Sequence, residues 1–100
     1  MVQVAIMPRL GVTMTEGTIL TWLKEVGDEV EVGEPLFEVQ MDKANMEVES
    51  LFGGIVLERV AEVGRVLPVG APVAIIGKRG EIYDRAALLP DTQGGTKGIV

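Results

Sequence analysis

The chain has 100 residues, lacks both histidine and cysteine, and carries a formal net charge of −6. Without cysteine, disulfide frameworks, thiolate zinc sites and cysteine nucleophiles are excluded. Without histidine, the commonest general base and metal ligand are missing, so no metal site is expected. An acidic chain with one tryptophan, one tyrosine and two phenylalanines is also a poor nucleic-acid binder. Any role in catalysis is therefore expected to depend on a group attached to the chain.

The first residues enter a strand-like alternation at once. They lack the basic and long apolar regions of a signal peptide and the Arg/Ser richness of a transit peptide. No apolar run approaches the roughly 18–20 residues of a membrane span, so no membrane partner is expected. These features predict a cytoplasmic protein, in agreement with the absence of cysteine.

The elements predicted in chain order are short strands. Polar and apolar residues alternate over 2–7 and 45–49, and a further strand is predicted at 36–40. Residues 20–32 have apolar positions at irregular spacing around Gly27, so no helix is predicted there. Glycine and proline recur between the apolar segments, which favours an all-β sandwich or barrel.

The two halves of the sequence repeat each other. A shift of 37 residues, without a gap, aligns glycines and prolines as well as apolar positions. Glycines at repeated positions indicate repeated turns. We therefore predict two copies of one β unit that form two face-to-face sheets, each copy supplying strands to both. The aligned positions are Gly17 with Gly54, Leu20 with Leu57, Glu25-Val26-Gly27 with Glu62-Val63-Gly64, Val32-Gly33 with Val69-Gly70, and Pro35 with Pro72.

The composition changes after the second copy. Residues 90–98 are rich in Gly, Thr, Asp and Pro and resemble a linker. The sequence therefore predicts one domain over residues 1–78 and a flexible linker or disordered tail over residues 79–100.

A short polar connection, Met41–Ala44, joins the two copies. Because a strand is expected on each side of it, it predicts a hairpin that projects Lys43 from one end of the domain. Between Lys24 and Ser50 nine acids and two lysines sum to −7. Position and charge alone are compatible with a lysine that is simply solvated on an acidic face. An exposed lysine has no desolvation to lower its pKa, so a catalytic amine is not supported.

The residues around this hairpin resemble the lipoyl domains of dihydrolipoamide acyltransferase components of 2-oxo acid dehydrogenase complexes. The resemblance spans roughly residues 1–78 and implies a flattened barrel, or barrel-sandwich hybrid, of two four-stranded antiparallel sheets with an internal pseudo-twofold axis. The segments that carry it are Met7–Ile19, Trp22, Val26–Val30, Gly33–Leu36, Asp42–Ala44, Met46–Ser50, Gly53–Val56, Gly64, Val69-Gly70 and Pro72.

The resemblance implies that Lys43, flanked by Asp42 and Ala44, carries lipoate through an amide bond. The implied role is that of a swinging-arm carrier. A lipoate ligase or lipoyl synthesis enzymes would attach the lipoyl group to it. Its expected partners are a thiamine-diphosphate-dependent decarboxylase, an acyltransferase core that uses coenzyme A, and dihydrolipoyl dehydrogenase. The isolated domain is not expected to be an enzyme, although a longer chain would be part of an acyltransferase.

The resemblance also singles out the loop after the first expected strand. In this family that loop lies near the lipoyl turn and helps the decarboxylase to recognise its carrier. An ordinary connection explains these residues equally well, and both interpretations stay open. The loop residues are Leu10, Gly11, Val12, Thr13, Met14 and Thr15.

Two alternatives remain at this stage. Biotin-carrier domains share the fold, but their lysine usually lies between two methionines, whereas Asp42 and Ala44 flank Lys43 here. This chain also has Gln40-Met41 where many lipoyl domains have Glu-Thr, which leaves the biotin interpretation a small weight. The other alternative is a binding module that docks a partner and is never modified.

Overall fold

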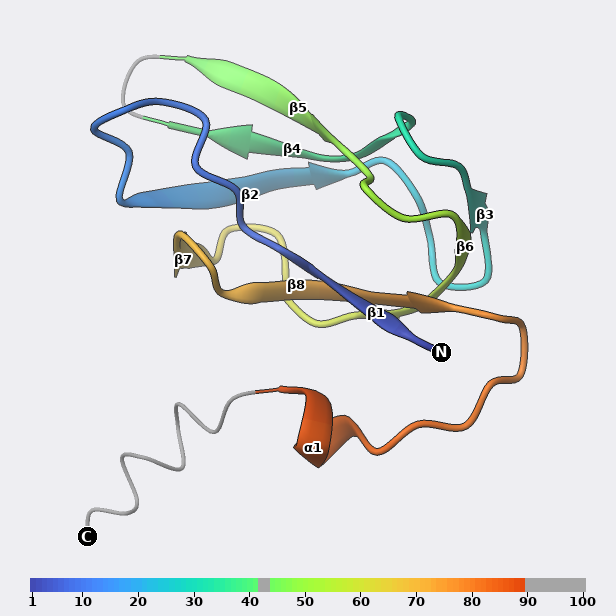
Figure 1. The fold of residues 1–100 in the computed structure, drawn as a ribbon. Coiled ribbons are helices and arrows are strands. Elements are labelled where there is room, and N and C mark those ends of the chain that lie inside the picture. Colours follow the sequence, from blue (N-terminus) through green and yellow to red (C-terminus); the bar gives the residue numbers. More distant parts are fainter. Residues whose placement is uncertain (42–43, 90–100) are drawn as a thin grey trace, which may run out of the picture.

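The regular elements of the described residues are short strands, apart from one helix of four residues. A computed structural model describes residues 1–41 and 44–89 (Figure 1). Strands predicted at 36–40 and 45–49 are present, and residues 20–32 contain the end of one strand and a second strand instead of a helix. The elements are β1 (Gln3–Ile6), β2 (Glu16–Trp22), β3 (Glu29–Val30), β4 (Pro35–Gln40), β5 (Asn45–Glu49), β6 (Gly54–Arg59), β7 (Val66–Pro68), β8 (Pro72–Gly77) and α1 (Arg85–Leu88).

The strands form two four-stranded sheets that face each other (Figure 1). One sheet has the order β1-β8-β6-β3 and the other β5-β4-β2-β7. Every neighbouring pair is antiparallel. The predicted fold class, an all-β sandwich of two antiparallel sheets, is confirmed.

The sheet orders display the internal repeat directly. Replacing β1–β4 by β5–β8, and the reverse, converts one sheet order into the other. Each half contributes two strands to each sheet, as the repeat predicted. The backbone bonds repeat as well: Gly27 N–H donates to the Val56 carbonyl at 2.8 Å, and Gly64 N–H donates to the Ile19 carbonyl at 2.7 Å. The turn of each half is thus bonded to a strand of the other half.

The two halves differ mainly in their connections. Nine residues separate β1 from β2, whereas four separate β5 from β6. The β4–β5 hairpin has its counterpart in the chain that follows β8. These departures from symmetry lie at the ends of the strands and leave the paired strands alike.

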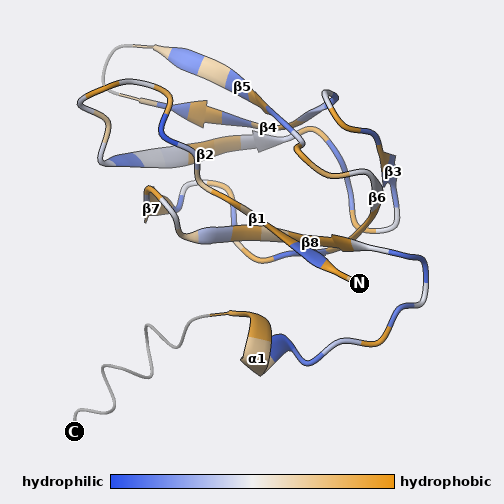
Figure 2. Ribbon diagram, in the orientation of Figure 1, coloured by the Kyte–Doolittle hydropathy of each residue, from blue (hydrophilic) through white to orange (hydrophobic). Residues whose placement is uncertain are grey.

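The space between the sheets is filled by aliphatic side chains and one aromatic ring. Trp22 covers the edge of this core: its ring lies 5.5 Å from that of Phe37, and its Nε1–H donates to the Ala61 carbonyl at 2.9 Å. Figure 2 shows the hydrophobic colours of β8 next to the hydrophilic connection that follows it. The largest fully buried side chains are Phe37, Met7, Ile19, Leu36, Ile75, Ile76, Val30, Val39, Val56 and Val73.

The chain after β8 contains a short helix. Asp84 caps α1 by accepting a hydrogen bond from Ala86 N–H at 3.1 Å. This segment belongs to the stretch 79–100 for which the sequence predicts a linker, and residues 90–100 lie outside the described residues. The four residues of α1 are too few for a helical period to be recognised in the sequence.

Within residues 1–41 and 44–89, no helix has the length and hydropathy needed to cross a membrane.

Gly17 provides a test of the packing between β2 and β4. A Cβ at this position would lie 2.6 Å from Val39 Cγ2 and 3.0 Å from Met14 Cε. Because Val39 is β-branched and fully buried, it has little freedom to move away. We expect Gly17→Ala to lower the free energy of unfolding by about 1–3 kcal/mol. Denaturant unfolding measures this difference.

Gly11→Ala is the matched control, because nothing lies within 4 Å of a Cβ at that position. We expect its stability to stay within about 0.5 kcal/mol of the parent chain. Equal stability of the Gly17→Ala variant and the parent would contradict the packing described here.

Candidate functional site

The β4–β5 hairpin forms one end of the molecule. Gln40 and Asn45 are the last register pair, and beyond them Met41 N–H donates to the Ala44 carbonyl at 2.8 Å. The hairpin therefore closes around a connection of two residues, the tightest common hairpin length. Those two residues, Asp42 and Lys43, lie outside the described residues, so their predicted roles are not tested. Ala44, the third residue predicted here, is exposed beside the closing bond.

The base of the hairpin is held by the core. Val39, two residues before the connection, is fully buried, and Met41 packs partly against the core. On its other side β4 pairs with β2, with Thr18 opposite Gln40. A side chain at the tip can therefore be exposed while the strands beneath it stay fixed.

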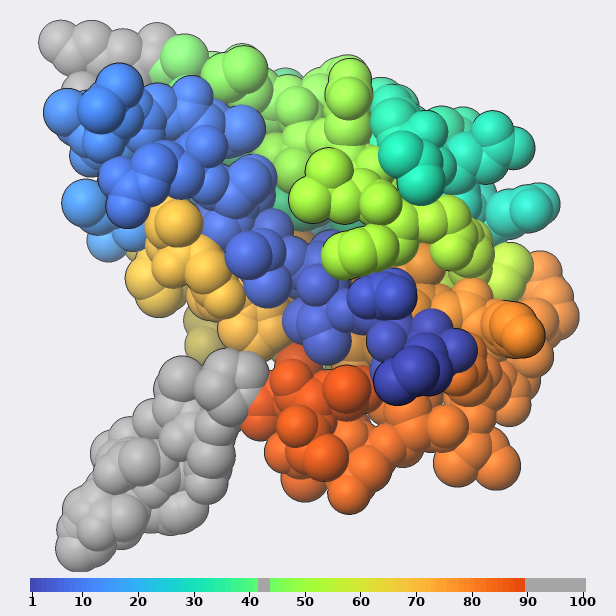
Figure 3. Space-filling view, viewed as in Figure 1, coloured from blue at the N-terminus to red at the C-terminus, as the bar shows by residue number. Residues whose placement is uncertain are grey.

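The loop between β1 and β2 lies beside this hairpin. Figure 3 shows its surface next to the start of β5, at the same end of the molecule. Met14 is buried, and its methyl group approaches Gly17, as Val39 does from β4. The Met14 sulfur accepts a hydrogen bond from Leu10 N–H at 3.2 Å. Met14 thus anchors the loop to β2, the strand that pairs with β4 of the hairpin.

The predicted recognition residues divide into two groups. Met14 is buried and Leu10 is half-buried, so both support the loop from inside. Val12, by contrast, is 90% exposed, and its carbonyl accepts a hydrogen bond from Arg9 Nη1 at 3.1 Å. The remaining members, Gly11, Thr13 and Thr15, are exposed. The sequence pattern does not distinguish the six residues, because it does not show that the Met14 side chain packs against Gly17.

The loop ends are fixed by the second half of the chain. Val69 N–H donates to the Thr15 carbonyl at 3.0 Å, and Gly70 N–H donates to the Met7 carbonyl at 2.8 Å. A loop with fixed ends, a buried anchor and an exposed tip presents a defined surface beside the hairpin.

Three of the acidic residues between Lys24 and Ser50 lie on the hairpin strands: Glu38 on β4, and Glu47 and Glu49 on β5. Glu38 and Glu47 lie directly opposite each other on β4 and β5. Like charges in such a pair are destabilising. This part of the surface is therefore not arranged for maximum stability.

Glu34 has a different environment from that pair. Its Oε1 accepts a hydrogen bond from Glu31 N–H at 2.9 Å and lies 3.3 Å from Lys24 Nζ. The backbone bond from Glu31, followed by Lys24, holds the pKa of Glu34 below its ordinary value of 4.5.

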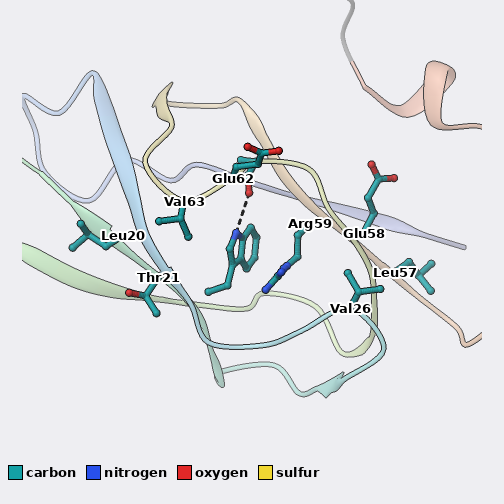
Figure 4. A pocket seen from close by; sticks show the side chains of 10 residues that line it. Leu20, Thr21, Val26, Leu57, Glu58, Arg59, Glu62 and Val63 are labelled. Carbon is teal, nitrogen blue, oxygen red and sulfur yellow. Dashed lines mark hydrogen bonds between the residues drawn. The ribbon is translucent and has the colours of Figure 1, made fainter.

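A cleft of about 620 Å³ lies between residues that the repeat makes equivalent (Figure 4). Leu20 and Leu57 line it from the two halves, as do Val26 and Val63. Trp22 and Arg59 also occupy equivalent positions, and the guanidinium carbon of Arg59 lies 5.6 Å from the centre of the Trp22 ring. No pattern in the sequence predicts this contact.

A second, largely apolar groove of about 440 Å³ runs between the edge strands β1 and β5 and includes Leu10 and Phe52. In residues 1–41 and 44–89, no group of three or more Asp or Glu side chains could hold a metal ion. The sequence pattern and the structure therefore both indicate the β4–β5 hairpin and the adjoining loop as the candidate site.

The sequence was compared with known families. A family profile described as "Biotin-requiring enzyme" matches residues 3–76, which include both copies of the repeat. The chain belongs to this biotin- and lipoyl-attachment family. The match covers all eight strands except the final residue of β8.

Curated relatives of this attachment domain are acyltransferase components. The chain is 52% identical over 75 residues to the dihydrolipoyllysine-residue acetyltransferase component of the pyruvate dehydrogenase complex of Corynebacterium glutamicum, covering 75% of this chain and 11% of the relative. It is 44% identical over 71 residues to the succinyltransferase component of the 2-oxoglutarate dehydrogenase complex of Staphylococcus saprophyticus, covering 71% and 17%. It is 41% identical over 70 residues to the acetyltransferase component of the acetoin cleaving system of Pseudomonas putida, covering 70% and 19%.

These relatives confirm the resemblance to lipoyl domains and favour it over the biotin alternative. The chain spans less than a fifth of the length of each of them.

Solved structures share the fold of this lipoyl domain. The lipoyl domain of the 2-oxoglutarate dehydrogenase complex from Azotobacter vinelandii has a TM-score of 0.58 at 23% identity, covering 75% of this chain and 96% of that one. The urea carboxylase of Kluyveromyces lactis has a TM-score of 0.65 at 22% identity, covering 77% of this chain and 6% of that one. At these identities the likeness concerns the fold alone.

The Glu34 contacts predict how the stability of the lipoyl domain depends on pH. A carboxyl whose pKa is lowered on folding binds its proton more weakly in the folded state. Its contribution is therefore complete above 4.5 and is lost as the pH falls through the lowered pKa of Glu34. We expect Glu34→Gln to be less stable than the parent near neutral pH, and the difference to shrink in acid.

Denaturant unfolding across this pH range measures the effect. Glu31→Gln is the control, because it removes a carboxylate from the same turn and keeps the Glu31 N–H donor. If the Glu34→Gln variant and the parent differ by the same amount at every pH, the contacts of Glu34 do not act as described.

Proposed function

We propose that this chain is a lipoyl carrier whose Lys43 bears lipoate. The observation that carries the proposal is the β4–β5 hairpin, which closes with the Met41–Ala44 bond around Asp42 and Lys43. The relatives support it, because their names describe a dihydrolipoyllysine residue in acyltransferase components.

The residues on both sides of the connection suit such an attachment. Ala44 and Asn45 are exposed, so no described side chain of the hairpin end encloses the attachment point. An amide between the Lys43 amine and the lipoate carboxyl removes one positive charge and changes the formal net charge from −6 to −7. When bound, the group supplies a disulfide that is reduced and acylated, chemistry for which a chain without cysteine or histidine has no residues of its own.

The task of the protein is then presentation. The hairpin whose connection contains Lys43 lies at one end of the molecule, and the buried Val39 and half-buried Met41 keep the hairpin base rigid. We infer that the carrier passes acyl groups and reducing equivalents between three enzymes of a 2-oxo acid or acetoin dehydrogenase complex: a thiamine-diphosphate-dependent decarboxylase, an acyltransferase core and dihydrolipoyl dehydrogenase. The domain itself is a carrier and no catalyst, and a cytoplasmic location stays a prediction of the sequence.

The loop beside the hairpin is proposed to take part in recognition by the decarboxylase. Its support is geometric: Val12 is highly exposed at the tip, and Met14 fixes the loop against β2, which pairs with β4 of the hairpin. Of the six predicted residues, Val12 and Thr13 are those we expect to touch a partner. Leu10 and Met14 are expected to act by shaping the loop.

Intact mass spectrometry tests the attachment. Co-expression with a lipoate ligase and lipoate should add the mass of one lipoyl group, and Lys43→Ala should abolish the addition. Lys78→Ala is the matched control. Lys78 is the first residue after β8, the position that corresponds to Met41 after β4 in the repeat, and it lies outside the hairpin. We expect this control to be fully lipoylated. No mass change in the parent chain, or addition of biotin in its place, would overturn the proposal.

A second prediction concerns the position of the lysine. Inserting one glycine between Asp42 and Lys43 lengthens the connection and displaces Lys43 from its place in the hairpin. We expect lipoylation to fall to the level of Lys43→Ala, because a modifying enzyme that recognises a folded tip needs the lysine at a fixed place. Thermal unfolding should remain close to that of the parent, since Ala44 and Asn45 next to the insertion are exposed. Retained lipoylation would indicate that the enzyme reads the lysine without regard to its placement.

A further inference from the structure

The chain does not leave the domain directly after β8. Lys78 N–H donates to Glu81 Oε1 at 2.9 Å, and Glu81 N–H donates to the Lys78 carbonyl at 2.9 Å. These two bonds close a turn that sends the chain back along the sheet containing β1, β8 and β6 (Figure 1). The turn is also packed tightly, since a Cβ on Gly77 would lie 2.7 Å from Glu81 Oε1.

The returning segment is bound to β6 through one carboxylate. The Tyr83 hydroxyl donates to Glu58 Oε1 at 3.0 Å, and Arg85 Nε donates to Glu58 Oε2 at 2.6 Å. Both oxygens of Glu58 are used by residues only two positions apart in the chain. Hydrogen bonds to a charged group are stronger than those between neutral groups. The side chain of Glu58 is 26% exposed, so the contact is partly shielded from solvent.

The helix that follows is too short to exist by its own propensity. α1 has four residues, none of them buried, whereas an isolated helix shorter than about 12 residues is marginal in water. Its support includes the Asp84 cap, the half-buried Leu88 and Leu89, and the bonds of Tyr83 and Arg85 to Glu58. All but the cap are contacts outside the helix, so α1 depends on its attachment to the domain.

This contact lies outside the repeated unit. The 37-residue shift places Thr21 at the position that corresponds to Glu58, and the chain after β4 continues into the hairpin. The family profile ends at residue 76, before the segment begins. The contact is thus a property of this chain beyond the shared domain.

We propose that Glu58, Tyr83 and Arg85 form a clasp that fastens residues 78–89 to the sheet and makes them part of the folded domain. While the clasp is closed, residues 78–89 run along the sheet of β1, β8 and β6. The β4–β5 hairpin lies at the far end of the other sheet (Figure 1). Opening it would free the 12 residues from 78 to 89, which span about 20 Å root-mean-square as a flexible chain.

This gives the clasp a role in the reach of a tethered carrier, a consequence that rests on the proposed function. The reach of a tether sets the effective concentration of the carrier at each partner's site. The clasp itself does not depend on lipoylation.

The tyrosine provides a direct readout, because the chain has only one. Burial, followed by the Glu58 carboxylate, raises the pKa of Tyr83 above its ordinary value of 10.0, while Arg85 opposes the rise. Ultraviolet absorbance of the tyrosinate follows this titration without a label.

The experiment compares the 100-residue chain with Glu58→Gln and the matched control Glu62→Gln. Glu62 lies in the connection after β6 and is exposed, so the control removes one nearby carboxylate and keeps the clasp. Glu58→Gln should return the pKa of Tyr83 toward 10.0, whereas Glu62→Gln should leave the raised pKa unchanged. Emission of the single Trp22 confirms that each variant is folded.

Hydrogen exchange of α1 gives an independent measurement. The amides of Ala87, Leu88 and Leu89 donate to the Asp84 and Arg85 carbonyls. We expect their exchange to be about tenfold faster in Glu58→Gln and in Tyr83→Phe than in the parent chain or in Glu62→Gln. Unprotected amides in the parent, or a Tyr83 pKa that does not respond to Glu58→Gln, would overturn the clasp. Lipoylation of Lys43 is unaffected by either outcome, so a failure of the clasp is distinguishable from a failure of the proposed function.

Discussion

The fold depends on the exchange of backbone hydrogen bonds between its two halves. Gly27 of the first half donates to Val56 of the second, and Gly64 of the second donates to Ile19 of the first. Each half also places two of its strands in each sheet. Neither half can satisfy its own backbone groups or cover its own apolar residues, so the repeat is stable only as an interlocked pair. The central part of the molecule is consequently under strict constraint.

The ends of the strands are under weaker constraint, and the functional features lie there. At the end of β4 the chain makes the hairpin around Asp42 and Lys43, whereas at the end of β8 it turns back toward Glu58. The connection after β1 is longer than the one after β5 and supports an exposed tip on the buried Met14. The functional features thus lie where the two copies of the repeat differ in their connections.

Much of this could be predicted from the sequence, because turn residues and apolar positions repeat together. The glycine pairs, such as Gly27 with Gly64, indicated both the repeat and the two-sheet arrangement, and the hairpin followed from strands on either side of a short connection. The role of Met14 could not be predicted, since its burial depends on the missing side chain of Gly17. The contact of Tyr83 with Glu58 joins residues 25 apart through side chains alone, and no local pattern encodes such a bond.

The distribution of charge agrees with this division between centre and ends. Glu38 and Glu47 repel each other across β4 and β5, at a cost of a few tenths of a kcal/mol to about 1 kcal/mol. The strands tolerate that cost because their pairing is secured by buried neighbours: Phe37 lies opposite Val48, and Val39 is fully buried beside them. Stability supplied on the inner face leaves the outer face free to hold charges that do not stabilise the fold. The same separation lets the described end of the hairpin be exposed: Val39 lies within the core, whereas Ala44 and Asn45 face the solvent.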